Sequence, residues 1–246
     1  MTTPFTLSLA AVDVIWEDLG LGVPVYPLDV PRSGIAHDEH AAIRAAVLDD
    51  LARRGLARDG RVEPRVAAAF TTMAAPDVSV SAIGMAAGRE LLALAVSTHE
   101  RAVLAVQDGQ HLSIDHPRPS NLVEALLGLL PDIRRGIGQS VTISTGPGAR
   151  SEKALARSCL TRPRTAFGRL SVSGSRAVPF DLNWFDTDRG RYVCYSRTGQ
   201  GGGATWITYA PADRRDMAHL LSEAAAGSRP GHGWAARRSS SPVAPT

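Results

Sequence analysis

The stretch AVLAVQDGQHLSI, residues 102–114, contains the clearest structural signal in the chain. Within it, two apolar runs are joined across Asp108-Gly109, and an Asp-Gly pair between such runs is typical of a tight β-hairpin. The run Leu91–Val96 before it is continuously apolar, and residues 78–82 alternate apolar with small or polar side chains. We therefore expect a group of antiparallel strands joined by short turns.

Further strands are predicted on both sides of this group. The opening run from Leu7 to Trp16 alternates apolar with small or polar residues, which predicts a strand. Tight turns are expected at residues 189–190 and 198–203, between later apolar runs. The strands predicted in the second part of the chain cover residues 141–143, 183–185, 192–195 and 205–209.

Helix signals alternate with these strands. The predicted helices cover residues 38–54, 64–75, 121–130 and 213–224, with a short one from about Ser151. Gly55 supplies a left-handed C-cap for the first helix, and Pro64 is a favourable first residue for the second. Asn121, with Glu124 three residues later, begins the third helix, and Asp213 caps the last one.

Strands joined by hairpins, with helices set between them, predict an α+β fold with a central antiparallel sheet flanked by helices. The order strand, glycine turn, strand, proline, capped helix occurs twice, over residues 91–130 and 184–224. This duplication suggests two similar halves related by a pseudo-two-fold repeat. We expect one domain over residues 1–226, with halves at roughly 1–145 and 146–226.

The composition is that of a globular protein with a basic tail. The 246 residues are 44% hydrophobic and 21% charged, which is enough to bury a sizeable core. Residues 227–246 contain three arginines and no acid, and without them the 27 basic residues fall to 24, equal to the 24 acidic ones. The pI near 9.2 therefore does not indicate a nucleic-acid-binding face. The Gly/Ser/Pro/Arg composition predicts that this tail is disordered.

Neither a membrane segment nor a secretion signal is expected from the sequence. No run approaches the ~20 apolar residues that cross a bilayer, and the first residues have no basic stretch before an apolar one. We therefore expect a cytosolic protein without a membrane partner. Cys159 and Cys194 have no metal-ligand spacing, so they are interpreted as unpaired thiols in a reducing compartment.

Several polar motifs resemble functional sites, but each favours a structural role. His37 and His40 flank two acids but lack the spacing of a zinc protease, so His40 is expected to face water. The run 186–190 resembles the opening of a calcium loop, but its glycine comes one place early and no acid closes it, which favours a hairpin turn. Residues 146–148, Gly-Pro-Gly, lack the further groups of a phosphate cradle. We expect no catalytic residue, no metal and no cofactor.

A winged-helix DNA-binding regulator is the alternative function. The predicted helices 38–54 and 64–75, followed by strands, could imitate such a domain. The second helix, however, places Arg65 before the apolar run 66–70, which offers few groups able to read base edges. We therefore expect that the protein has no nucleic-acid partner.

The combination of segments resembles the EspG family, the specialised chaperones that accompany substrates of mycobacterial-type (type VII) secretion systems in actinobacteria. The likeness spans roughly Leu7 to Ala226. The segments that carry it are residues 7–20, 27–28, 47–56, 76–80, 184–192 and 210–213. One motif inside this region, Tyr209 to Asp213, matches the Tyr-x-x-x-Asp/Glu pattern of the substrates, but it is interpreted as a strand end followed by a helix cap.

The resemblance implies a non-enzymatic protein with two similar α/β halves around an antiparallel sheet. Mycobacterial members of the family bind the helical tip of PPE proteins in PE–PPE pairs, shield its apolar surface and deliver the pair to the secretion ATPase complex. The implied partner is thus a PPE-like helical secretion substrate. Family members use the loop between the second and third strands and the C-terminal sheet region, which would here be residues 84–89 and about 196–206.

The candidate partner-binding residues follow from these two regions. A surface that covers a helix tip needs polar groups to orient the partner and apolar area to cover it. Whether the tryptophan among the candidates belongs to this surface or to the core is left open by the sequence. The candidates are Arg89, Ser196, Arg197, Gln200 and Trp206.

Overall fold

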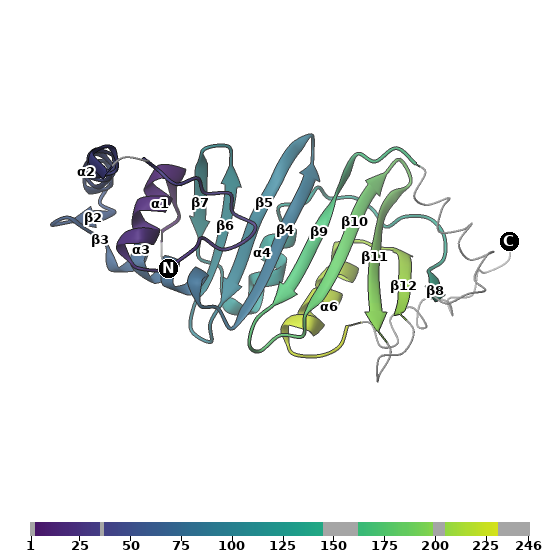
Figure 1. The fold of residues 1–246 in the computed structure, drawn as a ribbon. Helices are drawn as coiled ribbons and strands as arrows, with labels where there is room; N and C mark the ends of the chain where they lie inside the picture. The colour runs from purple at the N-terminus through teal and green to yellow at the C-terminus, as the bar shows by residue number, and fades with distance from the viewer. Residues whose placement is uncertain (1–2, 35–36, 145–161, 199–204, 231–246) are drawn as a thin grey trace, which may run out of the picture. The chain divides into compact units, whose positions relative to one another are not determined.

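The computed structural model describes residues 3–34, 37–144, 162–198 and 205–230 of the chain (Figure 1). Its sheet strands are β1 (Phe5–Ser8), β4 (Val78–Ala86), β5 (Arg89–Ser97), β6 (Ala102–Asp108), β7 (His111–Asp115), β8 (Val141–Ser144), β9 (Ala166–Ser173), β10 (Phe180–Thr187), β11 (Gly190–Thr198) and β12 (Thr205–Pro211). A separate small hairpin pairs β2 (Ala57–Arg58) with β3 (Arg61–Val62). The helices are α1 (Leu9–Asp18), α2 (His37–Arg53), α3 (Pro64–Ala74), α4 (Leu122–Leu127) and α6 (Arg214–Ala225), with a 3-10 turn, η1 (Pro119–Asn121).

The ten strands hydrogen-bond in the order β1-β7-β6-β5-β4-β9-β10-β11-β12-β8. This antiparallel sheet, together with the helices, confirms the predicted α+β class. The repeat suggested by the sequence is not confirmed. Among the described residues, no helix is both long enough and apolar enough to cross a bilayer.

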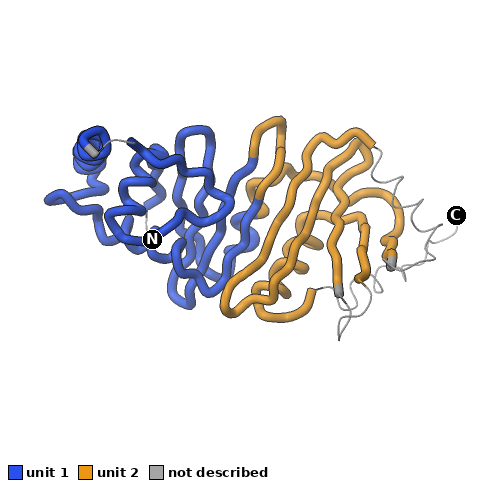
Figure 2. Tube along the Cα trace, viewed as in Figure 1, with its two compact units in different colours: residues 1–82, 91–126 blue, residues 83–90, 127–246 orange. Residues whose placement is uncertain are grey.

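The chain divides into two compact units (Figure 2). Unit 1 comprises residues 1–82 and 91–126, and unit 2 comprises residues 83–90 and 127–246. Strands β4 and β5 therefore contribute residues to both units. The single domain over 1–226, with halves at 1–145 and 146–226, stays a prediction.

Unit 1 is built on the predicted hairpin. Strands β6 and β7 pair from Leu104 opposite Asp115 to Asp108 opposite His111, so Gly109-Gln110 form a two-residue turn. Gly109 has a φ of 54°, which is a left-handed conformation that glycine adopts without steric cost. The outer strand β1 pairs with β7, and the helices α1 and α3 contact β7 and β6. Their shared core includes Leu7, Val12, Trp16, Phe70, Leu94 and Ile114.

The strand predicted from Leu7 to Trp16 is wrong. Only the first residues form β1, and the Ser8 hydroxyl accepts a hydrogen bond from the Ala11 amide at 3.2 Å, which caps α1. From Leu9 onward the buried side chains follow a helical spacing that includes Val12 and Trp16. The run is apolar at nearly every position, so it is compatible with an alternating strand pattern as well as a helix. The Ser8 cap favours the helix.

The two helices predicted next are confirmed. Helix α2 ends as expected at a glycine cap: the Leu56 amide donates to the Leu51 carbonyl at 2.8 Å, and Gly55 has a φ of 64°. Helix α3 has Pro64 at its start, where a missing amide proton costs nothing. The third predicted helix is shorter than expected, because α4 ends at Leu127.

Unit 2 contains a strand that the sequence did not reveal. Strand β9 pairs with β10 from Ala166 opposite Asp186 to Val172 opposite Phe180. Its sequence, AFGRLSVS, includes a glycine, an arginine and serines, which weaken the apolar signal of a strand. The short helix predicted from Ser151 lies outside the described residues, and so do residues 231–246 of the tail predicted over 227–246.

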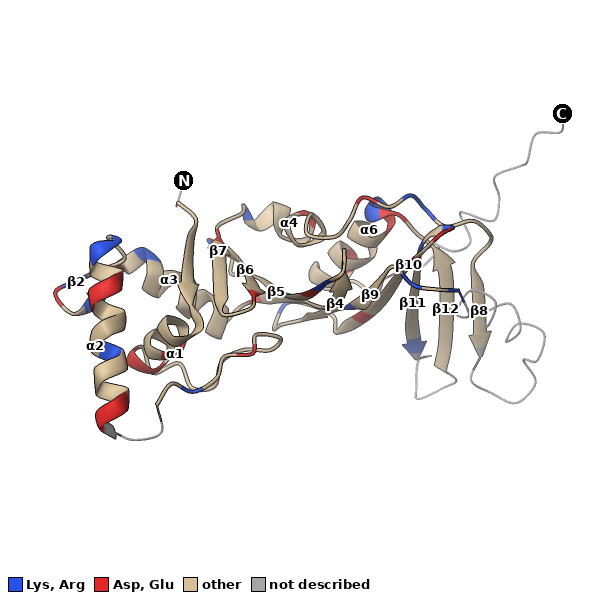
Figure 3. Ribbon diagram, turned by 90° about the horizontal axis from the view of Figure 1, so that it is seen from above, with Lys and Arg blue, Asp and Glu red and all other residues tan. Residues whose placement is uncertain are grey.

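Helix α6 covers one face of the unit 2 strands (Figure 3). It begins with a reciprocal capping box: the Asp213 carboxylate accepts from the Asp216 amide at 2.9 Å, and the Asp216 carboxylate accepts from the Asp213 amide at 3.1 Å. The helix buries Met217, Leu220 and Leu221, as predicted.

The turn between β10 and β11 holds a buried ion pair. The guanidinium of Arg191, with no exposed surface, donates to both Asp186 oxygens at 2.7 and 2.8 Å and to the Pro131 carbonyl at 2.9 Å. Gly190, with a φ of 112°, follows the turn, and a Cβ there would lie 2.6 Å from the Arg134 carbonyl oxygen. Only glycine fits this close approach, which seats the 131–134 segment against the hairpin.

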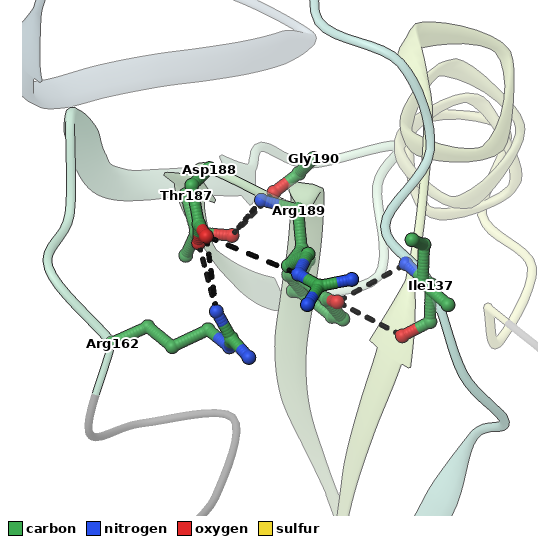
Figure 4. Close-up of polar contacts among 7 residues, drawn as sticks. Ile137, Arg162, Thr187, Asp188, Arg189 and Gly190 are labelled. Carbon is green, nitrogen blue, oxygen red and sulfur yellow. Dashed lines mark hydrogen bonds and ion pairs between the residues drawn. The ribbon is translucent and has the colours of Figure 1, made fainter.

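Further polar contacts complete the same turn (Figure 4). The Thr187 hydroxyl accepts from the Arg189 amide and donates to the Gly190 carbonyl, both at 3.1 Å. Arg162 donates to Asp188 at 3.0 Å. The run 186–190 is therefore a hairpin turn, as predicted, and the described residues contain no cluster of three or more ligand side chains suited to a metal.

The first testable prediction concerns the buried ion pair. Replacing Asp186 by alanine leaves the Arg191 charge buried without compensation, so we expect the free energy of unfolding to fall by about 3–5 kcal/mol. Urea unfolding followed by circular dichroism measures this loss. The matched control is Asp188→Ala, two residues away, which removes only an exposed ion pair and is expected to cost less than about 1 kcal/mol. Equal losses in the two variants would contradict this assignment.

Candidate functional site

The face of the unit 2 sheet opposite α6 is the candidate functional site. Side chains alternate between the two faces of a strand, so the residues that do not point toward α6 share this second face. We call it the open face. Its residues from β9 to β12 include Phe167, Arg169, Asn183, Phe185, Cys194, Ser196, Ile207 and Tyr209.

A row of polar side chains crosses the open face. Arg169, Asn183, Cys194 and Tyr209 are successive cross-strand partners. The Arg169 Nε donates to the Asn183 side-chain oxygen, and the Asn183 amide donates to the Cys194 carbonyl, each at 3.4 Å. These long contacts hold the amide and guanidinium groups at the surface without saturating them.

An aromatic cluster lies beside this row. Phe185 is buried between the Tyr192 ring, stacked at 5.6 Å, and the Arg164 guanidinium, 5.3 Å from the ring centre. Its cross-strand neighbour Phe167 is 46% exposed. The open face thus presents one accessible aromatic ring next to hydrogen-bonding groups.

A hollow of about 420 Å³ adjoins the exposed ring. A Cβ on Gly84 would lie 2.2 Å from the Phe167 carbonyl oxygen, so no side chain can stand at this point. A Cβ on Gly168 would likewise collide with the Trp184 ring, at 2.1 Å, on the side of the sheet that α6 covers. The hollow is lined on the open face by Phe167, Arg169, Asn183, Cys194 and Tyr209.

Burial changes the acidity of two groups in the row. Desolvation raises the pKa of the Cys194 thiol, and a hydrogen bond with the Tyr209 side chain partly opposes this rise. The pKa of the Tyr209 phenol is also raised, mainly by desolvation and further by the neighbouring thiol. Both groups are therefore neutral at physiological pH and act as hydrogen-bonding groups rather than charges.

The structure separates the residues predicted to bind a partner. Ser196 is exposed on the open face. Arg197 and Trp206 are cross-strand partners on the opposite face, because successive residues of a strand point to opposite sides. Arg89 is exposed at the start of β5, four strand steps from β11 in the sheet order, or about 19 Å. Gln200 lies outside the described residues.

The alternative that Trp206 belongs to the core is wrong, because its side chain is 45% exposed. Its neighbour Arg197 lies with its guanidinium 5.2 Å from the centre of the Tyr195 ring. The Nε and Nη2 atoms of Arg197 are buried and have no hydrogen-bond partner within the described part of the chain. Because Trp206 is exposed, this end of β11 and β12 is a second accessible surface of unit 2.

The loop predicted at residues 84–89 is also wrong. Strand β4 extends to Ala86, and only Ala87 and Gly88, both with a positive φ, separate it from β5. A two-residue turn therefore takes the place of the predicted loop. Phe167 and Arg169, which the sequence analysis missed, lie on the unpredicted strand β9. The alternation of polar and apolar residues after Ala166 is the pattern that could have predicted this strand.

Two further sequence expectations change. The Nε2 atom of His40 lies 2.8 Å from a Glu17 oxygen, so this side chain contacts α1 instead of facing only water. The β2–β3 hairpin lies between helices α2 and α3. The alternative of a winged-helix DNA-binding regulator stays a prediction. Cys194 is a free thiol, as expected, whereas Cys159 and the 146–148 motif lie outside the described residues.

Fold and site together define an α+β protein whose antiparallel sheet carries an exposed aromatic ring among polar groups, a composition suited to binding another protein. The sequence matches the model of the EspG family over residues 8–223. The chain therefore belongs to the EspG family, which confirms the resemblance found in the sequence. No curated protein sequence matches the chain.

A solved structure with a similar fold is that of the type VII secretion system chaperone EspG5 of Mycobacterium tuberculosis in complex with the PE25-PPE41 dimer. The match covers 90% of this chain and 95% of that chain, with a TM-score of 0.66 and 15% sequence identity. At this identity the match shows a shared fold.

The second testable prediction uses the thiol of the open face. Because burial raises the pKa of Cys194, the pH at which its alkylation rate is half-maximal should lie above the ~8.5 of an ordinary thiol. Replacing Tyr209 by phenylalanine removes a hydrogen bond that lowers this pKa, so the midpoint should move higher still. Peptide mass spectrometry after iodoacetamide pulses measures the rate at this site alone.

The unfolded chain in urea serves as the internal control for this experiment, since its thiols have ordinary pKa values. A midpoint in the folded protein at or below that of the unfolded chain would contradict the geometry of the row.

Proposed function

We propose that this protein is a cytosolic, non-enzymatic chaperone that binds and escorts helical PE–PPE-like substrates of a type VII secretion system. Membership of the EspG family supports this role. So does the shared fold with a chaperone whose structure was solved together with a PE25-PPE41 dimer. A binding role also suits the open face, which offers area and hydrogen-bonding groups.

The partner is proposed to contact the open face of unit 2. The observation that carries this is the 46% exposed Phe167 beside a hollow of about 420 Å³, since an exposed aromatic ring in a concave surface is a typical anchor for a protein partner. Asn183 and Arg169 supply donors that can orient polar groups of the partner. Ser196 extends the same face toward the end of β11.

The physical need for such a surface follows from the partner's chemistry. A helical protein that exposes an apolar tip aggregates unless that tip is covered. A sheet face can cover a helix end because its side chains form a broad platform, and apolar anchors contribute most of the binding energy. Arg197 and Trp206, on the opposite face, provide a rival location that can be tested in the same experiment.

The third testable prediction compares the two faces of unit 2. A charge at the centre of an apolar contact must be desolvated on binding, so Phe167→Asp should weaken capture of a co-expressed PE–PPE pair at least tenfold, about 1.4 kcal/mol. The melting temperature should change little, because the replaced ring is already half exposed. Binding is measured by isothermal titration or by co-purification on a tagged substrate.

The control variant is Trp206→Asp, which introduces the same charge at a ring of nearly equal exposure on the other face. Retained capture by this variant is expected. Loss of capture with Trp206→Asp and not with Phe167→Asp would move the interface to the side of Arg197. Failure of the unmodified protein to bind any PE–PPE pair encoded in its own genome would remove the proposed function.

A further inference from the structure

Unit 1 contains a second concave surface, unrelated to the open face. It is a groove of about 510 Å³ between α3, the turn that precedes β6, and the segment 116–119 that follows β7. Small apolar side chains form its floor, among them Ala68, Ala69 and Ala102. Three arginines line it, Arg65, Arg101 and Arg118, and we call it the arginine groove.

The three guanidinium groups are available to a ligand. Arg101 and Arg118 are exposed, and within the described residues none of the three arginines forms an ion pair. Arg65 is held in place, with its guanidinium 5.9 Å from the centre of the Phe5 ring and weak contacts of 3.5 Å to two backbone carbonyls. The one acid that lines the groove, Glu100, lies 3.5 Å from His99.

His116 adds an unsatisfied polar atom to the groove. Its ring lies 6.0 Å from the Phe5 ring, and its Nε2 atom is buried with no hydrogen-bond partner in the described part of the chain. Burial lowers the pKa of this imidazole, Asp115 opposes the effect and Arg65 adds to it. A buried nitrogen without a partner is costly, so a ligand that hydrogen-bonds to this atom gains free energy.

We propose that the arginine groove binds an acidic peptide segment of a protein partner, with its carboxylates on Arg65, Arg101 and Arg118 and its small apolar side chains on the alanine floor. Arginine suits this role because its planar guanidinium binds a carboxylate through two parallel hydrogen bonds. The floor favours a peptide over a nucleic acid, since a phosphate backbone gains nothing from alanine side chains.

The test uses the full chain and a fluorescein-labelled hexapeptide of alternating glutamate and alanine, followed by fluorescence anisotropy. Saturable binding below about 1 mM is expected, with weaker binding as salt is added, because exposed ion pairs are screened. Arg101→Glu combined with Arg118→Glu should weaken binding at least tenfold. Both side chains are exposed, so the melting temperature should stay nearly unchanged.

Matched controls separate this site from general electrostatics. Arg58→Glu combined with Arg176→Glu makes the same change in net charge at exposed positions outside the groove and should leave peptide binding intact. A glutamine–alanine peptide of the same length should bind at least tenfold more weakly. A duplex oligonucleotide should not compete for the site.

A second readout reports on the groove itself. A carboxylate bound beside His116 favours the imidazolium, so the pKa of His116 from an NMR titration should rise when peptide is present. The charged groups around it, Arg65, Asp115, Glu100, Arg101 and Arg118, are unchanged in that comparison. A rise that disappears in the Arg101/Arg118 double variant places the peptide in the groove.

Three outcomes would overturn the proposal: no saturable peptide binding, equal binding by the groove and control variants, or tighter binding of the oligonucleotide that depends on the same arginines. The outcome is independent of the chaperone role, because capture of a PE–PPE pair is measured separately and should survive the Arg101/Arg118 substitutions.

Discussion

The ion pair between Asp186 and Arg191 is the constraint on which unit 2 depends. Two charges that are almost completely removed from water are tolerated only in close mutual contact, so β10 and β11 have one compatible register. The backbone of Arg191 also forms hydrogen bonds with the backbone of Arg134, Gly136 and Ala212. One residue therefore ties the hairpin to the segment after α4 and to the chain that enters α6.

This attachment leaves the two faces of the unit 2 strands with different roles. On one side, Leu182, Trp184 and Tyr195 are almost fully buried on the face that α6 covers. On the other side the alternate residues remain accessible, including an exposed phenylalanine and a row of amide, thiol and phenol groups. The strand alternation thus generates the open face, because each residue that points toward α6 sends its neighbour to the opposite side.

The open face and the arginine groove differ in chemistry in a way that suits different ligands. The open face has a neutral thiol and phenol beside Phe167, with Arg169 as a charged donor, which favours an apolar partner that also accepts hydrogen bonds. The arginine groove has three cations above an alanine floor, which favours carboxylates next to small side chains. The EspG fold is shared with EspG5 at 15% identity, so surfaces of this kind must be read from the residues of this chain itself.

The sequence by itself determined the features that depend on a few neighbouring residues: the Asp-Gly hairpin, the Gly55 and Asp213 caps, the turn at 186–190 and membership of the EspG family. Only the tertiary structure decided the rest. It showed that a helix begins at Leu9, that β9 exists, that Trp206 is exposed and that β11 extends through Ser196 and Arg197. Turns and caps form through local hydrogen bonds and so leave a local signal. Burial and strand pairing depend on contacts between distant segments, for which no short pattern exists. The same holds for the arginine groove, which brings together Arg65, Arg101 and Arg118.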